Sequence, residues 1–95
     1  MTLLSRQKLE DCFDGGAVFL YEFAEPWTDV RIRSLASLGK LDYHTDFPRP
    51  LFRLACPDGL FARGLADTRQ CRVVLPGTGR NSAEQSFEAA LFRMD

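Results

Sequence analysis

Lysine and histidine are scarce in this chain, which carries only Lys8, Lys40 and His44 of these two types. The twelve basic residues therefore include ten arginines. Arginine binds carboxylates and phosphates as a planar fork of donors, whereas lysine acts as a point charge. The net charge is −1, which excludes the overall basic character of a general nucleic-acid-binding protein. A local arginine patch is still compatible with that total.

Cysteine is also sparse, with Cys12, Cys56 and Cys71 widely separated. Small secreted domains usually carry a denser and even-numbered set. No apolar run approaches membrane-spanning length, and the first residues lack the apolar core of a signal peptide. These absences predict a soluble protein of a reducing compartment, and we expect it to be cytoplasmic.

The length of 95 residues suits one domain over 1–95. A domain of this size buries only about 60–65% of its unfolded surface, so a large internal active-site cavity is not expected. A homodimer would bury more surface.

The first half of the chain predicts two helices around one strand. Residues 3–14 have Leu9, Cys12 and Phe13 on one helical face, and a Gly-Gly pair follows as a stop signal. Residues 17–24 are apolar on both faces, as in a strand well inside a sheet.

Residues 28–38 fit two structures. Thr28 can cap a helix with Ile32, Leu35 and Ala36 inward, but residues 30–33 also alternate as a strand would. We favour the helix.

The second half predicts four strands and a final helix, over 41–47, 51–56, 60–65, 70–75 and 81–95. Ser82 and Gln85 have the spacing of a capping box for that helix. The element order becomes α-β-α-β-β-β-β-α. We therefore predict an α+β domain with a five-stranded, largely antiparallel sheet and helices packed on one face.

The register of the last three strands follows from their turns. Cys56-Pro57-Asp58-Gly59 fits a type I turn with glycine in the left-handed position. That turn places Arg53 opposite Arg63, and the next turn places Arg63 opposite Arg72. Phe61 lies beside this row. Pairing the strand over 41–47 through a short turn would set Asp46 opposite Arg53.

The same register separates Cys56 from Cys71 by two strands and four residues, roughly 16 Å. A disulfide needs Cα atoms within about 7 Å. Both thiols are therefore expected to be free and buried, acting as small hydrophobic side chains.

Two weaker candidate sites remain. Gly77, Gly79 and Arg80 precede the last helix, where a flexible backbone and a helix start could accept an anion, although the phosphate-binding Lys-Ser/Thr pattern is missing. His44, flanked by Asp42 and Asp46, is a candidate acid/base group without a nucleophile in the predicted register.

We therefore expect a non-enzymatic binding module without metal or cofactor. Its ligand-binding residues would be Arg53, Phe61, Arg63 and Arg72, contacting a small anionic ligand or an acidic protein. Nucleic acid is a less favoured partner, and no membrane partner is expected. The alternatives are a small enzyme using His44 and a purely structural homodimer.

Overall fold

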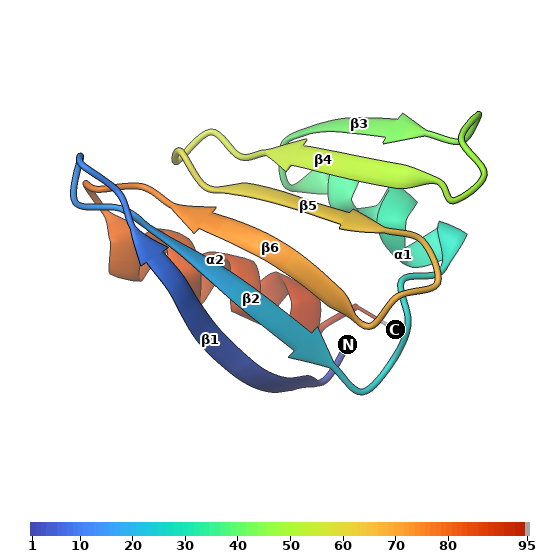
Figure 1. Ribbon diagram of the computed structural model, residues 1–95, viewed down its shortest axis with the longest axis horizontal. Coiled ribbons are helices and arrows are strands. Elements are labelled where there is room, and N and C mark those ends of the chain that lie inside the picture. The colour runs from blue at the N-terminus through green and yellow to red at the C-terminus, as the bar shows by residue number, and fades with distance from the viewer. Residues whose placement is uncertain (95) are drawn as a thin grey trace.

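The computed structural model describes residues 1–94, in which six antiparallel strands form one sheet and two helices lie on one of its faces (Figure 1). In chain order the elements are β1 (Leu3–Asp11), β2 (Ala17–Phe23), α1 (Asp29–Ser34), a 3-10 turn η1 (Leu35–Ser37), β3 (Lys40–His44), β4 (Leu51–Ala55), β5 (Phe61–Leu65), β6 (Gln70–Leu75) and α2 (Arg80–Phe92). Across the sheet the order is β1-β2-β6-β5-β4-β3. The predicted α+β class with helices on one face is confirmed.

The predicted first helix is wrong, because this segment is the edge strand β1, which gives the sheet a sixth strand and a β-β-α start. Leu9 and Phe13, which were expected to share one face of that helix, are exposed. The reason lies in β2, which is apolar on both faces and needs a hydrogen-bonded neighbour on each side. Such tertiary pairing overrides a weak local preference for helix. Gly15, with a φ of 88°, serves the hairpin turn rather than a helix end.

Helix α2 is held to β1 and β2 by a cluster of polar side chains at the edge of the core. Arg6 on β1 forms ion pairs with Glu84 and Glu88 on α2. The hydroxyl of Tyr21 donates to Glu88 Oε2 at 2.9 Å. The helix-facing side of β1 therefore contributes charge pairing through Arg6.

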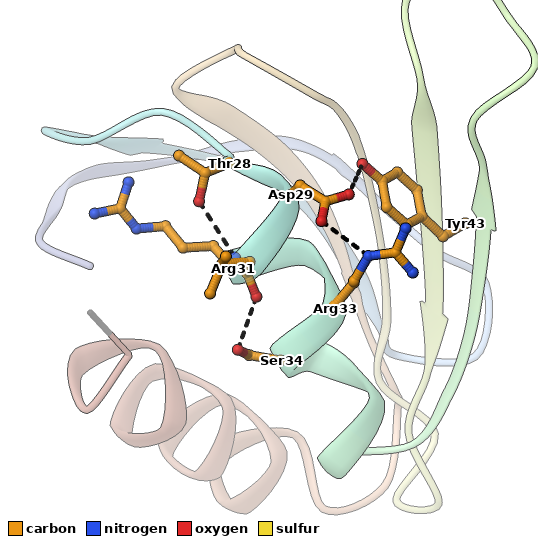
Figure 2. Close-up of polar contacts among 7 residues, drawn as sticks. Thr28, Asp29, Arg31, Arg33, Ser34 and Tyr43 are labelled. Carbon is orange, nitrogen blue, oxygen red and sulfur yellow. Dashed lines mark hydrogen bonds and ion pairs between the residues drawn. The ribbon is translucent and has the colours of Figure 1, made fainter.

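The segment that fitted two structures is helical, as favoured. Thr28 caps α1 by accepting from the backbone N–H of Arg31, and Ile32 and Leu35 are buried, although Ala36 is exposed. Figure 2 shows this cap and the polar contacts of α1.

A second set of contacts joins α1 to the edge strand β3. Asp29 accepts hydrogen bonds from Arg33 Nε at 2.9 Å and from the Tyr43 hydroxyl at 3.1 Å (Figure 2). The Arg33 guanidinium also lies 5.1 Å from the centre of the Tyr43 ring. These contacts fix the position of β3 against α1.

The core lies between the sheet and the two helices. Its largest fully buried side chains are aromatic: Trp27 packs edge-on against Phe23 at 5.6 Å and tilted against Phe52 at 4.8 Å between ring centres. Helix α2 contributes Ala83, Phe87 and Leu91 to this core. Trp27 and Phe23 are thus part of the core.

The predicted capping box of the last helix is wrong. Helix α2 begins at Arg80, and its N-cap is Gly79 in the left-handed conformation, with no side-chain cap bond. Glycine pays no steric penalty at this φ of 72°, so the backbone turn itself starts the helix before Ser82 is reached.

Burial raises the pKa of the Cys71 thiol, and burial followed by the hydrogen bond to Glu88 raises the pKa of the Tyr21 hydroxyl. A raised native pKa means that the unfolded chain loses these protons first. The free energy of unfolding should therefore fall as pH rises above about 9. Urea unfolding between pH 7 and 10 measures this slope, and Cys71→Val, which removes the thiol at similar volume, should reduce it. An unchanged slope would contradict the assignment.

Candidate functional site

The face of the sheet opposite the helices, called here the outer face, carries three arginines side by side. Arg53 on β4 lies opposite Arg63 on β5, and Arg63 lies opposite Arg72 on β6. We call these three residues the arginine row. All three side chains are exposed, and the predicted register of this row is confirmed. Directly paired residues in antiparallel strands have Cα atoms about 5 Å apart, so the row spans about 10 Å.

Apolar side chains lie beside the arginine row on both sides. Phe61 is half-buried and pairs with Ala55 and Val74, two residues along each strand from the arginines. On the other side Leu51 pairs with Leu65. The outer face is thus a strip of positive charge between two apolar strips.

The arginines elsewhere in the chain mostly have partners. Arg6 and Arg33 form ion pairs, Arg69 donates to the carbonyl of Ala24, and Arg80 lies over the ring of Phe19. Arg31 donates to the carbonyl of Pro26.

By contrast, the guanidinium groups of the arginine row form no ion pair or hydrogen bond with any group among residues 1–94. The row therefore places three like charges next to one another without an internal anion. Like charges directly opposite each other in a sheet are unfavourable.

The carboxylate expected opposite Arg53 is misassigned. Asp42, and not Asp46, is the register partner of Arg53, because β3 ends at His44 and a six-residue connection, 45–50, leads to β4. Pro48 and Pro50 have no N–H to give to a ladder, so the chain leaves the sheet earlier than the alternation of residues suggests. Even so, Asp42 and Arg53 are not within ion-pair distance in the described structure.

A hollow of about 360 Å³ adjoins the arginine row at the end of β5 and the start of β6. All three arginines line it. Its apolar walls are Leu20, Leu51 and Leu65, and its floor includes Phe52, Gly64 and Cys71. Sequence reasoning missed this hollow, although the glycine opposite a phenylalanine was a signal for it.

The hollow lies where the pairing of β5 and β6 stops, since the last register pair is Arg63 with Arg72. Beyond that pair the turn 66–69 bonds to the segment before α1. Trp27 exchanges backbone hydrogen bonds with this turn, and its indole Nε1 donates to the carbonyl of Gln70 at 3.1 Å. A side chain at Gly64 would meet the Phe52 ring, because its Cβ would lie 2.8 Å from two ring carbons. The buried aromatic residues thus shape the end of the outer face.

The candidate acid/base residue His44 is exposed at the end of β3. It pairs with Leu51 in the sheet, and its ring centre lies 6.1 Å from that of Phe47. Asp42 shares its face of β3, while Asp46 lies in the following connection. The enzyme hypothesis based on His44 stays a prediction.

The glycine loop before α2 has packing roles. The backbone at Gly77 approaches the β1–β2 turn so closely that a Cβ would lie 1.8 Å from the carbonyl oxygen of Asp14. The Arg80 guanidinium lies 5.4 Å from the centre of the Phe19 ring. Close backbone packing therefore accounts for Gly77 without a ligand.

All three cysteines are free thiols, as predicted for Cys56 and Cys71, although Cys56 is only half-buried. No group of three or more His, Cys, Asp or Glu residues within 1–94 is arranged to hold a metal ion. No helix in the same part of the chain is long and apolar enough to span a membrane.

Comparisons of this chain with protein-family models, curated protein sequences and solved structures give no match.

Proposed function

We propose that this protein is a small non-enzymatic binding module whose arginine row, with Phe61 beside it, contacts an anionic ligand or an acidic partner. The observation that supports this proposal is the alignment of three exposed arginines on adjacent strands with no anionic partner in the described chain. Such an arrangement costs stability in the isolated protein, and a bound anion would offset that cost.

The chemistry of arginine fits this role. Each guanidinium can donate two parallel hydrogen bonds to a carboxylate or phosphate, and such charge-assisted bonds are about twice as strong as neutral ones. Because the Cα atoms of neighbouring arginines in the row are about 5 Å apart, their long side chains can converge on one multivalent anion.

Calorimetric titration with pyrophosphate tests the proposal. We expect binding to the native protein at low salt, weakening as salt is added. Arg63→Gln, at the centre of the row, should weaken binding about tenfold or more, because a hydrogen bond to a charged group contributes about 1.5–3 kcal/mol.

Arg93→Gln is the matched control, since it removes one exposed arginine from the end of α2, on the helix side of the sheet. Equal loss in the two variants would mean that only net charge matters, and that the arginine row is not a site.

A further inference from the structure

We infer that the ligand of the outer face is a small organic phosphate, in which a phosphoryl group is attached to a short apolar body. This inference rests on the proposed function and names the chemistry of its ligand. It depends on the hollow beside the arginine row, where cationic and apolar groups line one space.

The charged part of the hollow favours a phosphate over a single carboxylate. Arg53, Arg63 and Arg72 bring three positive charges and no described counter-ion. A phosphate monoester carries nearly two negative charges at neutral pH and three acceptor oxygens. One phosphoryl group can therefore engage more than one guanidinium, whereas a carboxylate has two oxygens and one charge.

The apolar part of the hollow favours a ligand with a hydrocarbon portion. Leu20, Leu51 and Leu65 form its walls, and 39% of the Leu65 surface is exposed to solvent. Covering these leucines removes apolar surface from water, which stabilises the complex in proportion to the area covered.

The dimensions limit the ligand to a small one. The volume of about 360 Å³ is at the lower end of the range of about 300–1,000 Å³ found for small-molecule sites. The hollow lies on one side of the row only, so the phosphoryl group would sit on the arginines and the apolar body would extend toward the turn 66–69. An acidic peptide would pair with the arginine row, but its carboxylate side chains would offer no apolar group to cover the three leucines.

The test compares n-hexyl phosphate, inorganic phosphate and 1-hexanol by calorimetry on the whole chain. We expect n-hexyl phosphate to bind at least about tenfold more tightly than inorganic phosphate, since burial of two methylene groups alone gives such a factor. Hexanol should bind weakly. Affinity for n-hexyl phosphate should fall at pH 5, because a phosphate monoester loses its second charge below a pKa of about 6.

Two variants separate the apolar contribution from the charge. Leu65→Asn should abolish the advantage of n-hexyl phosphate while inorganic phosphate still binds, and Leu51→Asn on the facing strand should act alike. Leu4→Asn is the control, since Leu4 is 65% exposed on β1 at the far edge of the sheet. A melting curve for each variant verifies that it is folded.

The outcomes distinguish this inference from the proposed function. If both phosphates bind equally, the inference is wrong and the anion site stands. If hexaglutamate binds more tightly than n-hexyl phosphate, the ligand is an acidic protein and the inference is likewise wrong. If neither phosphates nor hexaglutamate bind, both proposals fail.

Discussion

Arg63→Gln is expected to stabilise the isolated protein at low salt while weakening its binding of anions. Arg63 faces a like charge on each side, Arg53 on β4 and Arg72 on β6. Removing two such contacts should raise the free energy of unfolding by about 0.5–1 kcal/mol. Urea unfolding at low ionic strength measures this gain, and added salt should diminish it, since salt screens exposed charges.

With pyrophosphate present, the native protein should be more stable than Arg63→Gln, the reverse of the order without ligand. A ligand at a hundredfold its dissociation constant stabilises the native state by about 2.7 kcal/mol, whereas a variant that binds tenfold more weakly would gain only about 1.4 kcal/mol at the same concentration. Arg93→Gln should show neither effect, apart from a small loss at the end of α2. If Arg63→Gln instead lowers stability by more than about 1 kcal/mol without ligand, the arginine stem is mainly covering apolar surface of the sheet.

Trp27→Ala is expected to lower the free energy of unfolding by about 3–5 kcal/mol, a large part of the stability of a domain this small. Trp27 is fully buried, packs against Phe23 and Phe52, and donates to the carbonyl of Gln70. Its loss would leave a cavity and a carbonyl without this donor. Urea unfolding followed by circular dichroism is the suitable measurement, because the substitution removes the fluorescent tryptophan.

Two further variants apportion this loss. Trp27→Phe keeps an aromatic ring but removes the indole donor, and should cost less than Trp27→Ala. Phe92→Ala removes an aromatic side chain that is 80% exposed, and should change stability by no more than about 0.5 kcal/mol. A comparable loss in Trp27→Ala and Phe92→Ala would contradict the description of the core.

The register of β4, β5 and β6 could be predicted because local turn chemistry and hydrophobic alternation agree there. Gly59 takes the positive φ that the turn requires, and the N–H of Leu60 donates to Asp58 Oδ1 at 3.1 Å. A slip of one residue would have moved arginines into the core. The arginine row therefore follows from the sequence.

Other features depend on contacts between distant segments and could not be predicted. The sequence of β1 fits a short helix, and only its pairing with β2 makes it a strand. The pairing of Asp42 with Arg53 depends on how far β3 extends, and Tyr43 fixes β3 through its hydrogen bond to Asp29 on α1. The hollow depends on Trp27 binding the turn 66–69, which is far away in the sequence.

The most direct test of the central claim is an NMR titration that observes the Nε–Hε groups of the arginine side chains during addition of pyrophosphate. The outer-face proposal predicts that the signals of Arg53, Arg63 and Arg72 shift together and saturate with one dissociation constant, while that of Arg93 moves little. Shifts of similar size at all exposed arginines, or none in the arginine row, would contradict it.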